Sequence, residues 1–244
     1  MSVHHKKPML GIIGGLGPMA TAYFMELIIS MTRADTDQEH IEMVILNRPQ
    51  TPDRTGYILG RSKENPIDDI TDMGLFLKKS GADVLAIPCI TAHYFHDELE
   101  EKLGMKVEHI IRETASYLKE RGIRKCGIMA TDGTVQSGLF QAELSRLGME
   151  TLVPGEEDQK KVMALIYEDV KAGRPIRTQF FEEVVSDLKA RGAQVIILGC
   201  TELSMIKKDH PVPAGILDAM EVLAATVVKR CGTLKDEYQE LITK

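Results

Sequence analysis

The chain has 244 residues, 43% of them hydrophobic, which is enough for one large domain or two small ones with a well-filled core and argues against intrinsic disorder. The formal net charge is −6, with acidic and basic residues interspersed and no basic stripe, which argues against a nucleic-acid partner. No apolar run reaches the roughly 20 residues of a membrane span, and the polar start at residues 2–7 lacks a signal-peptide core, so we expect a cytoplasmic protein with no membrane partner.

Short apolar runs alternate with longer stretches of helical period in the first half of the chain. Their spacing predicts strands at 9–13, 43–46 and 84–87 and helices at 19–31, 67–79 and 94–102. Strands that alternate with helices in this way are typical of a mostly parallel sheet covered by helices. We therefore expect an α/β fold.

The second half repeats this organisation. Its pattern predicts strands at 126–129, 195–198 and 216–217 and helices at 137–147, 157–172, 178–190 and 218–229. The halves also resemble each other in sequence, because Gly, Ala, Val and Cys coincide when residues 80–89 are set over 191–200. We predict two similar Rossmann-like α/β subdomains with mostly parallel sheets, related by a pseudo-twofold axis, with the active site between them. The first comprises 1–110 plus 215–244, and the second 111–214.

A cysteine follows the central strand of each half, Cys89 in the first and Cys200 in the second. Because ligands bind beyond the carboxyl ends of strands in open α/β sheets, we expect both thiols to face one cleft. Two opposed thiols suit the inversion of a stereocentre, in which one thiolate removes the α-proton and the opposite thiol returns one. A helix is predicted to start after each cysteine, and its N-terminus would lower the thiol pKa.

Other readings of these residues stay open. A cysteine at a strand end is often a small buried hydrophobe, which is our interpretation of Cys126 and Cys231, and no disulfide is expected. Cys89, His93 and His96 have a spacing that a helix brings together, as in a metal site, although no recognised zinc spacing accompanies them. Residues 15–20 fit the dinucleotide motif G-x-G-x-x-G/A, or they form a backbone anion site suited to a carboxylate.

Several residues near the predicted strand ends are candidates for substrate binding. Arg54 lies in the polar loop 47–54 and can clamp a carboxylate through two parallel hydrogen bonds, unless it is simply solvated. Lys171 ends a predicted helix, where a cation also stabilises the helix dipole. Thr131 and Thr134 follow a strand of the second half and offer hydroxyls beside the cleft, or serve as ordinary turn and cap residues.

The motifs at these positions resemble the cofactor-independent aspartate/glutamate racemase family, and most closely its aspartate racemase branch. The matching motifs cover residues 11–18, 37–40, 48–54, 88–93, 130–134, 167–173 and 199–202. The resemblance implies two α/β subdomains with the active site between them, no pyridoxal phosphate and no metal, and Cys89 and Cys200 as the acid/base pair. It also suggests a homodimer.

The same resemblance implies roles for the binding residues. Arg54 and Lys171 would hold the carboxylates of a small, acidic amino acid, and Thr91 and Thr201 its α-amino and α-carboxylate groups. Ile90 departs from the family, which usually has Asn between the cysteine and the threonine. Loss of that amide costs roughly 1 to 3 kcal/mol if its partner stays buried and unpaired. Ile90 would suit a bulkier or less polar substrate, or require a compensating polar group elsewhere.

The leading hypothesis is therefore an amino-acid racemase of the aspartate/glutamate type that inverts the α-carbon by proton transfer between Cys89 and Cys200. A cysteine-dependent decarboxylase or isomerase that acts on small diacids is a second hypothesis. A third is a non-catalytic amino-acid binding or regulatory protein, in which Ile90 marks the decay of catalysis. A nicotinamide-dependent oxidoreductase is the last.

Overall fold

The chain folds into two four-stranded parallel sheets with the same strand order, β2-β1-β3-β4 and β6-β5-β7-β8, in a computed structural model that describes residues 7–244. The first sheet contains β1 (Leu10–Gly14), β2 (Met43–Asn47), β3 (Val84–Ala86) and β4 (Val107–Glu108). The second contains β5 (Lys125–Ala130), β6 (Glu150–Leu152), β7 (Val195–Gly199) and β8 (Ile216–Asp218). The predicted α/β fold with two similar halves is confirmed. The polar start at residues 2–6 lies outside the described residues.

Helices connect the strands and cover both faces of each sheet. The α-helices are α1 (Pro18–Met31), α2 (Arg54–Ile58), α3 (Ile67–Lys79), α4 (His96–Leu103), α5 (Ile110–Glu120), α6 (Asp132–Ser137), α7 (Leu139–Arg146), α8 (Glu156–Ala164), α9 (Thr178–Ala190), α10 (Thr201–Asp209) and α11 (Ala219–Cys231). Short 3₁₀ turns occur at η1 (Asp37–Glu39), η2 (Ile90–Phe95) and η4 (Asp236–Gln239), and the π-helix η3 (Leu165–Val170) continues α8. No helix within residues 7–244 is long and apolar enough to span a bilayer.

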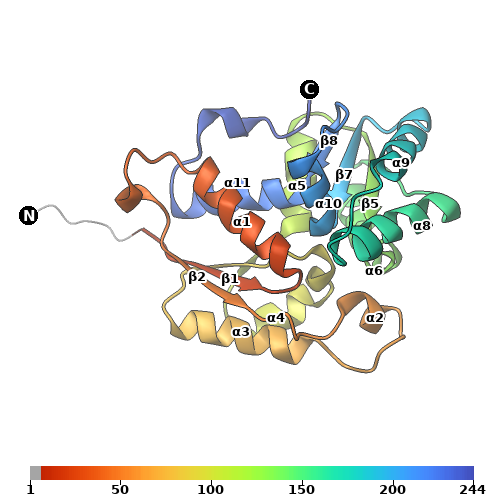
Figure 1. The fold of residues 1–244 in the computed structure, drawn as a ribbon. Coiled ribbons are helices and arrows are strands. Elements are labelled where there is room, and N and C mark those ends of the chain that lie inside the picture. Colours follow the sequence, from red (N-terminus) through yellow and green to blue (C-terminus); the bar gives the residue numbers. More distant parts are fainter. Residues whose placement is uncertain (1–6) are drawn as a thin grey trace, which may run out of the picture.

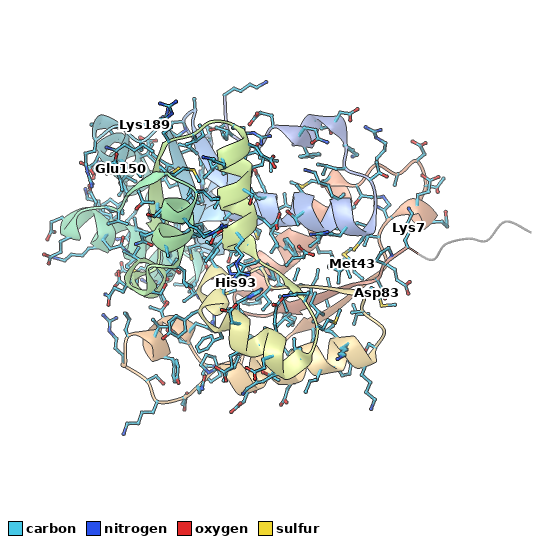
Figure 2. The ribbon with its side chains drawn as sticks, turned by 180° about the vertical axis from the view of Figure 1, so that it is seen from behind. Lys7, Met43, Asp83, His93, Glu150 and Lys189 are labelled. Carbon is cyan, nitrogen blue, oxygen red and sulfur yellow. The ribbon has the colours of Figure 1, made fainter. Side chains whose placement is uncertain are left out.

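The hydrophobic core has three parts, arranged as layers around the sheets. Helices α3 and α4 pack on the outer face of the first sheet, and α8 and α9 on the outer face of the second. The largest part lies between the sheets and contains side chains of α1, α5 and α11. Figure 1 shows α1 and α11 side by side above the strands of the first half, with α8 and α9 at the far end of the second. Figure 2 shows Met43 and Asp83 on one side of the molecule and Glu150 on the other.

Central strands are apolar on both faces because helices cover both. All five residues of β1 and of β7 are buried, as expected for strands inside a parallel sheet. The apolar residues of α3 recur at helical spacing, and Ile67, Ile70 and Leu77 are buried while the intervening charges stay outside. This continuous burial is the reason that the strand predictions at 9–13 and 195–198 were close to the observed bounds.

The boundaries between the two subdomains remain a prediction. The strand pairing of β8, however, joins it to the second sheet and not to the first. The segment 215–244 was assigned to the first subdomain, but β8 pairs with β7 in the second sheet. Helix α11, in contrast, packs against α1 and α5 between the sheets. The chain therefore completes the second sheet before it returns to the layer that joins the two halves.

Two neighbouring carboxyl groups, the buried Asp218 and the partly buried Glu221, lie where α10 and α11 meet. Asp218 accepts a hydrogen bond from Ser204 at 2.8 Å, and Lys207 Nζ lies 2.6 Å from Glu221 Oε2. Burial, and then the neighbouring Asp218, raise the pKa of Glu221 to about 7. A carboxyl whose pKa is raised in the folded protein stabilises the fold below its unfolded pKa, and this stabilisation is lost as the pH rises through the folded pKa.

We expect the free energy of unfolding of the wild type, relative to Glu221→Gln, to fall by roughly 2 to 3 kcal/mol between pH 5 and pH 8. Denaturant titrations of both proteins at several pH values measure this difference. The comparison with the variant is needed because burial also lowers the pKa of His93 and of His109, which weakens the fold on acidification instead. A difference that does not change with pH would contradict the prediction.

Candidate active site

The two cysteines of the internal repeat occupy equivalent positions in the two halves. Cys89 lies between β3 and η2, and Cys200 between β7 and α10, so each is the residue that precedes a helical turn. Their backbones are extended in the same way, with φ and ψ of −152° and 106° at Cys89 and −149° and 131° at Cys200. A helical segment follows each cysteine as predicted, although the first is a 3₁₀ turn. All four cysteines are free and buried.

Both thiols line one small cavity between the halves, and most predicted site residues line it with them. Its lining consists of Leu16, Asp53, Arg54, Thr55, Cys89, Ile90, Thr91, Thr131, Tyr167, Lys171, Cys200, Thr201 and Glu202. The cavity measures about 10 Å³, room for about one water molecule. A wider cavity of about 330 Å³ adjoins it and shares Asp53, Arg54, Lys171 and Glu202. An amino acid cannot occupy the inner cavity unless these shared side chains move.

Three threonine hydroxyls join the halves at this cavity. Thr91 Oγ1 lies 3.2 Å from Thr131 Oγ1 and 3.0 Å from Thr134 Oγ1, and the latter two are 3.2 Å apart. Thr131 also caps α6, because its Oγ1 accepts a hydrogen bond from the Thr134 backbone N–H. The structure thus brings Thr134 to the site through Thr91 and Thr131, although Thr134 does not line the cavity. We call this group the threonine triangle.

Arg54 is the first residue of α2 and is only 7% exposed, so it is not a solvated loop residue. Its Nη1 donates to the backbone oxygens of Thr51 and Pro52, and its Nη2 donates to that of Leu16 at 2.9 Å. A guanidinium has five N–H donors, so two remain, and Nε is buried without a partner within residues 7–244. Burial lowers the pKa of Arg54, but Cys89 and Asp53 outweigh this effect and raise it. Arg54 is therefore a fixed cation beside Cys89.

Cys200, Glu202 and Lys171 form a chain of contacts on the opposite side of the cavity. The Cys200 thiol donates to Glu202 Oε2 at 2.9 Å, and Lys171 Nζ lies 3.2 Å from Glu202 Oε1. Burial, and then Glu202, raise the pKa of Cys200 well above its ordinary value. Burial lowers the pKa of Lys171, but Glu202, Cys200 and Cys89 raise it by more than burial lowers it. The net pKa is therefore raised, and Lys171 stays charged. Lys171 therefore has a carboxylate partner before any substrate binds.

Sequence reasoning missed four polar residues of the cavity, namely Asp53, Thr55, Tyr167 and Glu202. The Tyr167 hydroxyl lies 3.4 Å from Asp53 Oδ1, and burial raises the pKa of Tyr167 to about 12. This contact connects η3 of the second half with the start of α2 in the first. Asp53 and Tyr167 belong to the motifs 48–54 and 167–173, so their place in the site was implicit in motifs already quoted.

The glycines of the motif 15–20 shape the mouth of the site. Gly15 has a φ of +89°, and a Cβ there would lie 2.3 Å from the Arg48 backbone N, so only glycine fits. A Cβ on Gly17 would lie 2.7 Å from Glu202 Oε1. Pro18 is the first residue of α1, one residue before the predicted start of this helix at 19. These contacts account for both glycines by close packing within the chain.

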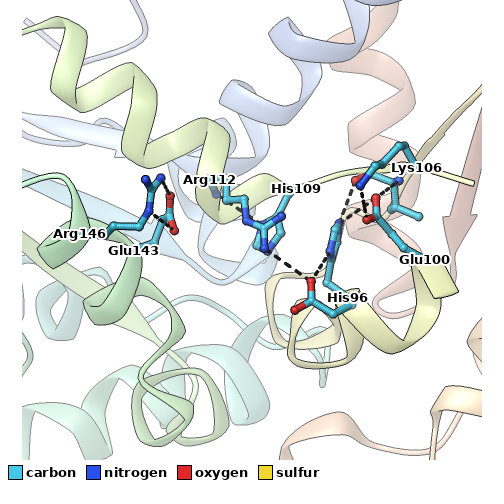
Figure 3. Close-up of polar contacts among 9 residues, drawn as sticks. His96, Glu100, Lys106, His109, Arg112, Glu143 and Arg146 are labelled. Carbon is cyan, nitrogen blue, oxygen red and sulfur yellow. Dashed lines mark hydrogen bonds and ion pairs between the residues drawn. The ribbon is translucent and has the colours of Figure 1, made fainter.

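His93 belongs to a cluster of three histidines behind η2. Its Nε2 accepts a hydrogen bond from the Ile110 N–H at 3.1 Å, and its ring lies 5.0 Å from that of His109. Figure 2 shows His93 near the centre of the molecule, and Figure 3 shows His96 and His109 with the charged groups around them. Burial and the neighbouring imidazoles lower the pKa of His93 well below its ordinary value. Within the described part of the chain, no group of three His, Cys, Asp or Glu side chains is arranged to hold a metal ion.

An ion pair between the buried Asp169 and the partly exposed Arg177 holds the segment that precedes Lys171. Asp169 is 3% exposed and accepts hydrogen bonds from the side chain and the backbone N–H of Arg177. Burial opposes ionisation of Asp169, but the bonds from Arg177 hold its pKa below the ordinary value. We expect Asp169→Asn to lower the free energy of unfolding at neutral pH by about 1 to 3 kcal/mol, as measured by urea denaturation.

Glu168→Gln is the matched control for this variant. Glu168 pairs with the same guanidinium at 2.9 Å, but its side chain is 60% exposed, and exposed ion pairs contribute little to stability. Its free energy of unfolding should stay within about 0.5 kcal/mol of the wild type. An equal loss of unfolding free energy in Asp169→Asn and Glu168→Gln would mean that the burial of Asp169 does not determine how much its ion pair stabilises the fold.

Comparisons with known proteins place this chain in a family. The family model described as Asp/Glu/Hydantoin racemase matches residues 13–227. The structure of an aspartate racemase from Picrophilus torridus superposes with a TM-score of 0.81 at 31% identity, over 95% of this chain and 98% of that one. The broad specificity amino-acid racemase RacX of Bacillus subtilis is 27% identical over 230 residues, which are 90% of this chain and 96% of that protein.

A more distant structure shares the fold. Glutamate racemase isoform RacE1 from Bacillus anthracis superposes with a TM-score of 0.63 at 21% identity, over 95% of this chain and 85% of that one. The likeness therefore extends to the two-sheet arrangement of a protein whose sequence has diverged widely from this one.

Proposed function

Because this chain belongs to the Asp/Glu/hydantoin racemase family and is a racemase, we propose that it inverts the α-carbon of an amino acid by proton transfer between Cys89 and Cys200. The observation that carries this proposal is that thiols from equivalent positions in the two halves line one buried cavity. One thiolate would remove the α-proton from one face, and the opposite thiol would supply a proton to the other face.

The surroundings of the thiols support this chemistry. A carbanion adjacent to a carboxylate needs cations and hydrogen-bond donors that are already in place, because their reorganisation would add to the barrier. Arg54 supplies a fixed cation with two free N–H donors beside Cys89. The threonine triangle supplies hydroxyls that can exchange their mutual hydrogen bonds for bonds to the substrate. Thr201 is buried in the same lining and follows Cys200 directly.

We propose an acidic amino acid as the substrate, since Arg54 and Lys171 both line the cavity. The relatives differ on this point, because the Picrophilus protein is named for aspartate and the Bacillus protein for broad specificity. Ile90 is 2% exposed and lines the cavity between the thiol of Cys89 and the hydroxyl of Thr91. It presents an apolar surface where an amide is usual in the family, so substrate size and polarity need a direct test.

The test is proton NMR of the protein in deuterated water with single enantiomers of aspartate, glutamate and a panel of other amino acids. A racemase washes out the α-proton signal of its substrate while the optical rotation decays to zero. The substrates that react define what Ile90 selects. Absence of exchange across the whole panel, with the thiols kept reduced, would contradict the proposal and favour a binding protein or a substrate that is not an amino acid.

A further inference from the structure

Glu202 is the one carboxylate in the cavity lining that contacts an active-site thiol directly. Its Oε2 accepts the hydrogen bond from Cys200 at 2.9 Å, and its Oε1 lies 3.2 Å from Lys171 Nζ. The residue is 5% exposed, so water does not screen these contacts strongly. Gly17 leaves room for the carboxylate, because a Cβ there would lie 2.7 Å from Glu202 Oε1. The position of Glu202 is therefore fixed from three sides.

The surroundings of the two thiols are opposite in charge. Cys200 faces the carboxylate of Glu202, whose acceptor oxygen requires a proton on the sulfur. Cys89 lines the same cavity as Arg54, whose Nε–H is buried and has no partner within residues 7–244. A cation beside a thiol stabilises the thiolate, whereas a carboxylate beside a thiol stabilises the thiol. The remaining titratable groups around the cavity are Lys171 and Tyr167 from η3 and its end, and Asp53 before α2.

We infer that Glu202 is a positioning residue that keeps Cys200 in its thiol form, so that Cys200 is the proton donor and Cys89 the proton acceptor of the resting site. The inference rests on the proposed function and adds which of the two thiols gives the proton and which one takes it. Only the enantiomer whose α-hydrogen faces Cys89 would react with the resting site. The opposite enantiomer would need the other protonation state, which Glu202 disfavours.

The proton balance follows from these assignments. The Cys89 thiolate takes the α-proton, so that an S–H bond forms and the electron pair of the C–H bond stays on the α-carbon. The Cys200 S–H bond then breaks, and its proton bonds to the opposite face of the carbon. The product leaves a Cys89 thiol and a Cys200 thiolate. The site returns to its resting form when Cys89 releases a proton to solvent and Cys200 takes one up, or when it converts the other enantiomer.

Burial alone could also keep Cys200 protonated, and the chain contains a comparison for that effect. Cys126 is a buried thiol in β5 with no carboxylate contact, and burial alone raises its pKa to about 12. For Cys200, burial and Glu202 both raise the thiol pKa, whereas Lys171 lowers it. Replacing only the charge of Glu202 therefore separates the two causes. Glu202→Gln keeps the size and one acceptor oxygen but removes the charge.

The experiment is carbon-13 NMR of the protein labelled at the cysteine β-carbons, titrated from about pH 6 to about pH 10.5. In the wild type, the Cys200 signal should change only near the upper end of this range, or not at all. In Glu202→Gln the Cys200 midpoint should fall by at least about one pH unit, while Cys126 is unaffected. The pH profile of kcat should move in the same direction. If Glu202→Gln does not fold, Glu202→Asp should give a smaller fall, because its carboxylate is withdrawn from the thiol.

Glu221→Gln is the matched control, because Glu221 is also a mostly buried carboxylate paired with a lysine, Lys207 at 2.6 Å, but it makes no hydrogen bond to a thiol within residues 7–244. It should leave the Cys200 midpoint unchanged. An unchanged Cys200 curve in Glu202→Gln, or a wild-type Cys200 signal that changes at the ordinary thiol pKa of about 8.5, would overturn the inference. These outcomes do not depend on turnover. Absence of α-proton exchange in the wild type would overturn the proposed function instead, whatever the NMR titration shows.

Discussion

Cys89→Ala and Cys200→Ala should each reduce racemisation on the order of 10²- to 10⁴-fold, the contribution typical of one acid/base group. Each variant keeps one thiol, which still faces one side of the α-carbon. We therefore expect residual exchange of the α-proton with solvent, without inversion and with only one enantiomer. The reactive enantiomer should differ between the two variants, because their remaining thiols come from opposite halves of the protein. Proton NMR in deuterated water with each enantiomer measures both quantities.

Cys126→Ala is the control for the loss of a buried thiol. Cys126 is fully buried in the core between the sheets and does not line the cavity. Its racemisation rate should stay within about twofold of the wild type once the folded fraction is accounted for, since core substitutions change stability and not the chemistry. If Cys89→Ala or Cys200→Ala still inverted the substrate at the wild-type rate, the mechanism with two thiols would be wrong.

Arg54→Lys should lower kcat/KM by about 10²-fold or more, although it preserves the charge. A lysine ammonium is a point charge that cannot reach the three backbone oxygens that hold Arg54 and also present two parallel donors to a carboxylate. Two charge-assisted hydrogen bonds contribute about 1.5 to 3 kcal/mol each, which sets the size of the loss. Steady-state kinetics with the substrate found in the exchange assay gives the ratio.

Arg48→Lys separates this effect from a general disturbance of the loop 47–54. The Arg48 side chain is 34% exposed and lies 3.5 Å from Asp69, outside the lining of both cavities around the thiols. Its kcat/KM should remain within about threefold of the wild type, because it loses only a weak and partly exposed ion pair. A similar loss in both variants would assign the effect to the loop and not to the guanidinium of Arg54.

Much of the fold could be predicted from the sequence because its central strands are buried on both faces. The runs that became β1, β5 and β7 are continuous and apolar, and the repeat of the Gly-Ala-x-Val motif before Cys89 and Cys200 indicated two equivalent halves. Strands β4 and β6 are absent from the prediction, because β4 has only two residues and β6 (Glu150–Leu152) begins with a charged residue and contains no apolar run. Helix α5 is absent from the prediction although Ile110, Thr114 and Leu118 have helical spacing, since the predicted subdomain boundary divided it.

The most direct site predictions were residues that follow strand ends. Cys89, Cys200, Thr131 and Thr201 all do, and parallel sheets place such residues at one edge. The partner of Lys171 was not predictable, because the contact with Glu202 depends on how α8 continues into the π-helix η3 and on how α10 leaves β7. Neither geometry has a sequence signature at this length. The buried state of Arg54 was equally hidden, because its three acceptors are backbone oxygens.

Several polar groups around the inner cavity already have partners within the chain, and this has a consequence for the concentration at which the site works. The threonine triangle, the Cys200 thiol and Lys171 have such partners, so a substrate must replace existing bonds at these groups, although two N–H donors of Arg54 remain for it. Each replacement cancels much of the binding energy that a new contact would give. We therefore expect a half-saturating substrate concentration toward the millimolar end of the usual range, so that the rate follows the supply of the amino acid nearly in proportion.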